Sequence, residues 1–156
     1  MRNAALFIFF FAFITSCSPL KIAGVPKNSS MIIVTNSQSA SENLLLVKKN
    51  LAENGIEISE QDKDIFQLKT GLTPVNKNGY SAYYIIYCKD GSIQTNGLYN
   101  TGNKEITIGE KVVTTSASMS NDPFRKIYYS KYGGSAYAFK AMHDLAKSFG
   151  NNLQYK

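Results

Sequence analysis

The sequence has few of the residues that build metal centres, disulfide frameworks and catalytic sites. Its 156 residues include one histidine and two cysteines, and tryptophan is absent. A zinc site needs three or four His, Cys or carboxylate ligands, and a disulfide framework needs several cysteine pairs. We therefore expect no metal, no cofactor and no catalytic residues, and we predict that the chain is not an enzyme.

The residues that are present have the balance of a folded protein. Hydrophobic residues make up 44% of the chain and charged residues 18%, which is typical of a globular domain. The length fits one domain. The formal net charge is +6, and the lysines are scattered along the chain. Such a pattern is typical of a solvated surface, and it would also suit anionic lipid head groups or an acidic partner.

The N-terminus has the pattern of an export signal. Arg2 precedes an unbroken apolar stretch over residues 4–14. A membrane-spanning helix needs about 20 apolar residues, so this stretch is too short to be one. Its length and its position suit the apolar core of a signal peptide.

The end of this stretch resembles the lipobox of bacterial lipoproteins, of the Bacteroidetes type. The motif places a bulky apolar residue and two small residues before a cysteine, here Ile14, Thr15, Ser16 and Cys17. The resemblance implies that residues 1–16 are removed and that a diacylglycerol is joined to the sulfur of Cys17. The alternative is an ordinary secretory signal with an incidental cysteine.

The residues after Cys17 bear on the destination. Ser18 stands where an Asp would, by resemblance to enterobacterial lipoproteins, retain the protein in the inner membrane. Residues 18–30 also lack an acidic cluster resembling a surface-export tag. We expect an outer-membrane anchor facing the periplasm, with residues 17–30 as the lipidated cysteine and its tether. In this compartment nucleic acid is not an expected partner.

Cys88 is the other cysteine of the chain. Once Cys17 carries lipid, an intrachain disulfide is excluded, so packing must hold the domain together. Cys88 ends an apolar strand, where a cysteine is typically a small buried hydrophobic residue. The alternative is pairing with another chain.

Periodicity predicts a strand over residues 31–34 and then a helix. Ser39 and Glu42 form a capping box at the start of this helix, and Gly55 ends it. A meander follows, with strands expected over residues 56–59, 65–69, 80–88, 93–99, 106–108 and 112–119. An Asp-Gly step at residues 90–91 predicts a tight hairpin turn.

The last part of the chain is predicted to end in a second helix. Residues 127–132 form either another short strand or a docked loop. Ser135 is expected to cap the helix, and Gly150 to end it. Together the elements predict an α+β domain over residues 31–156, with one antiparallel or mixed sheet of about five to six strands and both helices on one face. This order loosely resembles small α+β lipoprotein domains of unknown function, and TATA-binding-protein-like or helix-grip modules.

The strand over residues 80–88 is apolar on both of its faces. One face should contact the helices, which leaves Tyr83, Ile85 and Tyr87, together with Tyr99, as a candidate binding surface. Tyrosine suits interfaces because it has a large apolar area and a polar tip. The alternative is that loops at residues 72–78 or 119–125 cover this face.

Other candidate groups have ordinary explanations. His143 is expected at the surface or its boundary. The acidic group Glu60, Asp62 and Asp64 lacks the pattern of a calcium loop and is expected to be a solvated turn. The two glycines at residues 133–134 precede a helix, but no phosphate-binding loop surrounds them.

These observations predict a lipid-anchored cell-envelope protein that is a non-enzymatic binding or assembly module. Its expected partners are the membrane, through the lipid, and another envelope protein or polymer. The alternatives are a periplasmic immunity lipoprotein, a small-ligand carrier or enzyme with its site between sheet and helices, and a structural spacer.

Overall fold

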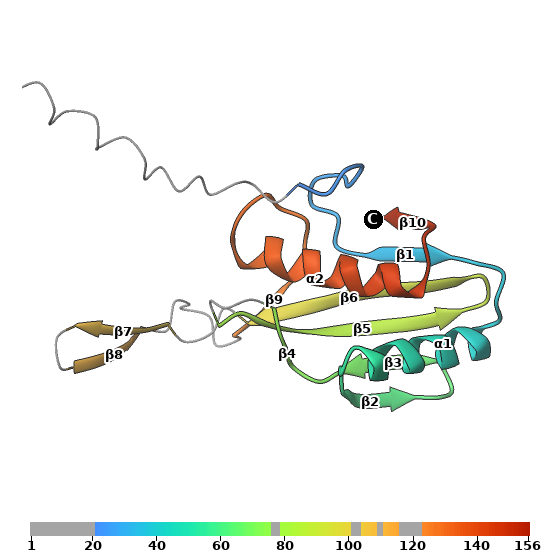
Figure 1. The fold of residues 1–156 in the computed structure, drawn as a ribbon, viewed down its shortest axis with the longest axis horizontal. Helices are drawn as coiled ribbons and strands as arrows, with labels where there is room; N and C mark the ends of the chain where they lie inside the picture. The colour runs from blue at the N-terminus through green and yellow to red at the C-terminus, as the bar shows by residue number, and fades with distance from the viewer. Residues whose placement is uncertain (1–20, 76–78, 101–103, 109–110, 116–122) are drawn as a thin grey trace, which may run out of the picture.

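The computed structural model describes residues 21–75, 79–100, 104–108, 111–115 and 123–156 (Figure 1). The elements follow one another as β1 (Ile32–Thr35), α1 (Ala40–Glu53), β2 (Ile58–Asp62), β3 (Gln67–Thr70), β4 (Thr73–Pro74), β5 (Ser81–Lys89), β6 (Ser92–Asn100), β7 (Lys104–Ile108), β8 (Lys111–Thr115), β9 (Phe124–Lys126), α2 (Gly133–Phe149) and β10 (Leu153–Tyr155).

Eight of these strands form one open antiparallel sheet. Its order is β10-β1-β6-β5-β3-β2, with β4 beside β5 and β9 beside β6. The centre is the long β5–β6 hairpin, which turns at Asp90 and Gly91; the positive φ of 73° at Gly91 is the conformation expected for the Asp-Gly step. The predicted α+β class is confirmed, but the strand number is higher than expected. The unforeseen strands β4, β9 and β10 have only two or three residues, too few to show an alternating pattern.

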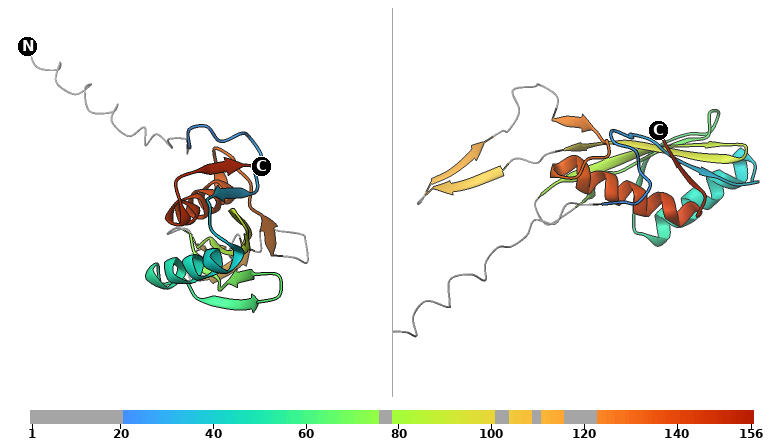
Figure 2. Two further views of the ribbon diagram at one scale, coloured as in Figure 1. Left: turned by 90° about the vertical axis from the view of Figure 1, so that its right-hand side faces the viewer. Right: turned by 90° about the horizontal axis from the view of Figure 1, so that it is seen from above.

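Both helices pack on one face of the sheet, as Figure 2 shows from above. The predicted capping box of α1 is present, because Ser39 and Glu42 satisfy each other's backbone N–H groups. Gly55 follows the helix with a φ of 66°. The core between helices and sheet is built from fully buried side chains of both layers, among them Val47, Leu51, Phe139, Met142, Tyr84, Ile86, Ile93, Val34 and Leu68.

The start of α2 differs from the expectation. The helix begins at Gly133, and Ser135 lies inside its first turn rather than capping it. The Ser135 hydroxyl instead donates to the backbone oxygen of Tyr128 at 2.7 Å and accepts from its backbone N–H at 2.9 Å. Residues 127–132 are therefore a docked loop, held to α2 by this serine, and the strand β9 lies just before them.

The N-terminal segment expected to be a tether lies against the domain in its described part, residues 21–30. Ile22 and Val25 pack on the core, and Ser29 is buried. Asn28 donates to the backbone oxygen of Tyr129, and the Tyr129 N–H donates to the backbone oxygen of Ser29 at 2.7 Å. Two apolar side chains and these backbone bonds hold the segment in place. Every core residue of the described chain lies at or after Ile22, so a chain that begins at residue 18 keeps this core.

The strands β7 and β8 form a hairpin of their own, separate from the main sheet among the described residues. Figure 1 shows this hairpin beyond the end of the sheet that carries β9. Both strands were expected, but the last four residues predicted for the second one, 116–119, lie outside the described part of the chain.

Candidate functional site

The predicted anchor lies outside the described residues. Ile14, Thr15, Ser16 and Cys17 all precede residue 21, where the description begins. Cleavage and lipidation at Cys17 therefore stay predictions. Two surfaces of the described domain can be examined directly.

The first surface is the face of the sheet opposite the helices, called here the open face. Along β5, Ala82, Tyr84, Ile86 and Cys88 are buried toward the helices. Tyr83, Ile85 and Tyr87 alternate with them and are partly exposed on the other side. The alternation of the sequence thus predicted the two faces of this strand, and the three candidate side chains do lie together.

Tyr99 does not belong to the open face, which corrects our expectation. It pairs with buried Ala82 and is only 6% exposed, so its ring faces the helices. Burial raises the pKa of its hydroxyl. The residue that β6 contributes beside Tyr83 is Leu98. The two-residue turn sets this register, and counting outward from Asp90 and Gly91 would have placed Tyr99 correctly.

Amide and lysine side chains lie beside the apolar residues of the open face. In the strand register, Tyr87 lies between Gln94 on β6 and Gln67 on β3, and Ile85 lies between Asn96 on β6 and Lys69 on β3. All of these side chains are partly exposed. The open face therefore combines two tyrosine rings and the aliphatic side chains of Ile85 and Leu98 with uncharged amide groups and the ammonium group of Lys69.

One end of the open face is partly covered. The Tyr83 ring meets the ring of Phe124 edge-on at 5.3 Å, so part of the segment at residues 119–125 does shield this residue, in line with the alternative prediction. The Lys69 ammonium lies 5.2 Å from the centre of the same ring, close enough for a cation–π contact. Tyr83 is thus held in place, and Ile85 and Tyr87 lie farther along β5 toward the hairpin turn.

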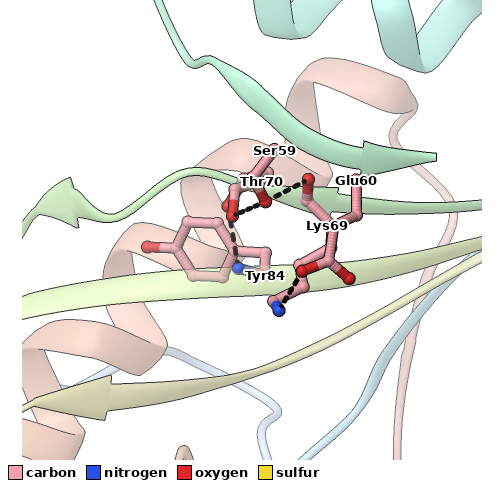
Figure 3. Close-up of polar contacts among 5 residues, drawn as sticks. All are labelled: Ser59, Glu60, Lys69, Thr70 and Tyr84. Atoms are coloured by element: carbon pink, nitrogen blue, oxygen red, sulfur yellow. Dashed lines mark hydrogen bonds and ion pairs between the residues drawn. The ribbon is translucent and has the colours of Figure 1, made fainter.

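Polar contacts fix the edge of the sheet beside the open face (Figure 3). The Ser59 hydroxyl lies 3.1 Å from the backbone oxygen of Lys69 and 3.0 Å from that of Thr70, at a point where the β2 register shifts. The buried Thr70 hydroxyl accepts the backbone N–H of Tyr84 at 2.9 Å. Lys69 pairs with Glu60 at 2.7 Å, and this hydrogen bond raises the Lys69 pKa. These bonds tie β2 and β3 to the central strand.

The second surface is a hollow of about 780 Å³ lined by parts of residues 21–27 and 129–132, called here the N-terminal hollow. Its walls are mostly apolar, with Lys21, Lys27 and Lys131 among them. Sequence reasoning missed it because its two walls are more than 100 residues apart. The sequence feature that could have indicated this hollow is the charge pattern, because residues 18–41 and 123–143 contain no Asp or Glu.

Groups with possible chemistry are placed in structural roles. His143 is buried rather than at the surface, and it stacks on Tyr155 with ring centres 6.1 Å apart. Its Nδ1 lies 3.4 Å from an Asp144 oxygen. The Cys88 thiol is free and buried, and burial raises its pKa to about 11, which keeps it protonated. Asp62 accepts the backbone N–H of Asp64, as a residue of a turn does.

Across the described residues, no group of three or more His, Cys, Asp or Glu side chains is placed to hold a metal ion. In the same part of the chain, no helix has both the length and the apolar character to cross a membrane. No protein-family model matches this chain, and no curated protein matches it significantly.

Proposed function

We propose that this protein is a lipid-anchored module of the cell envelope that binds an envelope protein or polymer through its open face and performs no catalysis. The observation that carries the binding role is the position of Tyr87 and Ile85. They lie partly exposed on β5, between β3 and β6, while both helices pack on the opposite face. A partner covering them would remove apolar area from water, which is favourable by about 25 cal/mol per Å².

The composition of the open face supports a specific interaction rather than non-selective hydrophobic association. Tyrosine is common among the residues that dominate binding energy, because its rigid ring gives a large contact area. Gln67, Gln94 and Asn96 can donate and accept hydrogen bonds around it. A partner that offers a flat apolar patch ringed by hydroxyl, amide or peptide groups would complement this arrangement.

The proposed location follows from the lipobox resemblance alone. A diacylglycerol on Cys17, with a second acyl group at the new N-terminus, would hold the domain firmly, since each buried methylene contributes roughly 0.8 kcal/mol. We propose an outer-membrane anchor facing the periplasm. In that setting the module would recruit or retain its partner at the membrane surface.

The binding role can be tested by site-specific photo-crosslinking in living cells. A photoreactive amino acid at position 87 should give a discrete adduct with one partner after irradiation. The matched control places the same group at Leu45, which is 65% exposed on α1, away from the open face. Equal adducts from both positions, or adducts from position 45 alone, would contradict a role for the open face.

A substitution series then tests the chemistry of the contact. Tyr87→Thr and Ile85→Thr remove apolar area and place a β-branched side chain that suits a strand. Each should abolish the adduct formed from a neighbouring position, such as Gln94, without changing the free energy of unfolding by more than about 0.5 kcal/mol. Tyr137→Ala, on the exposed side of α2, serves as the control and should leave the adduct in place.

A further inference from the structure

We infer that the N-terminal hollow is a binding site for the head group of an anionic phospholipid in the membrane that carries the anchor. The inference rests on the proposed lipid anchor at Cys17 and adds a second contact with the same bilayer. The domain would then lie on the membrane in a defined orientation instead of swinging on a tether.

The hollow lies close to Cys17 along the chain. Lys21 lines the hollow and is four residues after Cys17. Four residues of fully extended chain reach at most about 14 Å. If acyl chains on Cys17 are inserted in a bilayer, the hollow must therefore lie close to the head groups of that bilayer.

The hollow is lined by positive charge. Lys21, Lys27 and Lys131 line the hollow and are exposed, and no ion pair with an acidic group engages them among the described residues. The two chain segments that form its walls contain no Asp or Glu. A basic group near an anionic membrane surface strengthens binding about fivefold, so three of them give a weak site by themselves, which the proximity supplied by the anchor would reinforce.

The walls of the hollow are mostly apolar. Ile22 and Val25 contribute apolar surface, and Tyr132 stands at the rim with 66% of its surface exposed. Tyrosine collects at the boundary between lipid and water, because its ring is apolar and its hydroxyl is polar. Ammonium groups around an apolar floor match a phosphate joined to the glycerol and upper acyl chains of a lipid.

Hydrogen bonds hold the two walls of the hollow together. The Tyr129 hydroxyl accepts the backbone N–H of Ile22 at 3.1 Å, and the Tyr129 backbone bonds residues 28 and 29. One residue thus joins both walls. Helix α2 also starts beside the hollow, with Tyr132 as its N-cap. The helix dipole favours an anion at that end.

The experiment uses the chain from residue 18 onward, which keeps the described core and lacks the anchor cysteine. Because the chain has no tryptophan, Tyr132→Trp introduces a single reporter at the rim of the hollow. Leu45→Trp, on exposed α1, is the matched control. Each variant is mixed with vesicles of phosphatidylcholine alone or of phosphatidylcholine with phosphatidylglycerol, with and without brominated acyl chains.

We expect the tryptophan emission of the Tyr132→Trp variant to shift to shorter wavelength and to be quenched by brominated lipid on vesicles that contain phosphatidylglycerol. On vesicles of phosphatidylcholine alone, the partition coefficient should be lower by at least about tenfold. The emission of Leu45→Trp should respond to neither kind of vesicle. Added to the Tyr132→Trp background, Lys27→Gln or Lys131→Gln should each lower the partition coefficient about fivefold. The control Lys63→Gln, at the β2–β3 turn, should leave it unchanged.

Three results would overturn the inference. They are equal responses from the Tyr132→Trp and Leu45→Trp variants, equal partitioning to both kinds of vesicle, and an effect of Lys63→Gln as large as that of Lys131→Gln. Because this chain has no Cys17, the outcome is independent of lipidation. If Cys17 is not lipidated, the protein in cells should be unprocessed or soluble, and the vesicle result should be unaffected. If the hollow does not bind the head group, the vesicle experiment should show it, and lipidation in cells should be unaffected.

Discussion

The side-chain amide of Asn36 donates a 2.7 Å hydrogen bond to the side-chain oxygen of Asn43, which is fully buried in the first turn of α1. The Asn43 amide donates in turn to the backbone oxygen of Lys89 at 2.8 Å. This pair joins the helix to the end of β1 and to the turn of the central hairpin. A polar residue inside the core thus holds three elements together.

Asn43→Ala should therefore be strongly destabilising. It removes the hydrogen bonds to the Lys89 carbonyl and the Asn36 amide at a partly buried site and empties the fully buried space of the Asn43 side chain, which costs about 1–3 kcal/mol. Urea unfolding followed by circular dichroism measures the change. Asn50→Ala is the control, because the Asn50 side chain bonds only the Leu46 backbone of its own helix, and it should cost less than about 0.5 kcal/mol. Equal losses for both variants would contradict the joining role of Asn43.

Gly134 is predicted to tolerate no side chain, although it lies in a helix. A Cβ there would come within 2.7 Å of a Tyr80 ring carbon and 2.8 Å of a Tyr99 ring carbon. Gly134→Ala should lower stability by about 1–3 kcal/mol through overpacking, against the gain of about 1 kcal/mol that alanine usually brings to a helix. Thermal unfolding shows whether Gly134→Ala lowers or raises the stability. The variant Ala141→Gly, which should be destabilised by about 1 kcal/mol, shows the ordinary preference within the same helix.

Cys88 should make the domain sensitive to alkaline pH. Burial raises the pKa of its thiol from 9.0 to about 11 in the folded state. The group therefore stabilises the fold fully below about pH 9, and this contribution is lost as the pH rises toward 11. The free energy of unfolding should fall less steeply in Cys88→Val as the pH is raised through this window. In a chain without Cys17, the native thiol should resist a thiol reagent at neutral pH and should react on unfolding.

The capping box should be visible in the titration of Glu42. Hydrogen bonds from the Ser39 backbone and then from its side chain lower the Glu42 pKa below its usual 4.5. The ionised Glu42 carboxylate therefore stabilises the start of α1 above about pH 4.5, and this stabilisation is lost as the pH falls through its lowered pKa. Carboxyl chemical shifts measured by NMR should give a Glu42 pKa that moves back toward 4.5 in Ser39→Ala. An unchanged value would show that the capping hydroxyl contributes nothing.

Cys17→Ala tests the anchor. Without the thiol, no diacylglycerol can be attached, so the precursor should stay unprocessed and should not incorporate labelled fatty acid. Cys88→Ala is the control, and it should be processed and labelled like the wild type. Cleavage at the same bond and firm membrane association in Cys17→Ala would show that the lipoprotein interpretation is wrong.

Local patterns in the sequence were sufficient for the elements whose information is contained within one turn or one strand. The pair Ser39 and Glu42 marks the start of α1 because both partners lie within one helical turn. The Asp-Gly step marks the central hairpin, and alternation assigns Tyr83, Ile85 and Tyr87 to one face. The α+β class follows from the order of these elements.

Contacts between distant residues were decided only by the tertiary structure. β10 pairs with β1 across more than 100 residues, and its three residues carry no pattern of their own. Ser135 binds the backbone of Tyr128 instead of capping its helix, and Tyr129 holds residues 28 and 29 against the domain. Each depends on a backbone partner far away in the sequence or on the exact path of a loop. The sequence by itself therefore determined the candidate anchor and the two faces of β5, and packing alone created the N-terminal hollow.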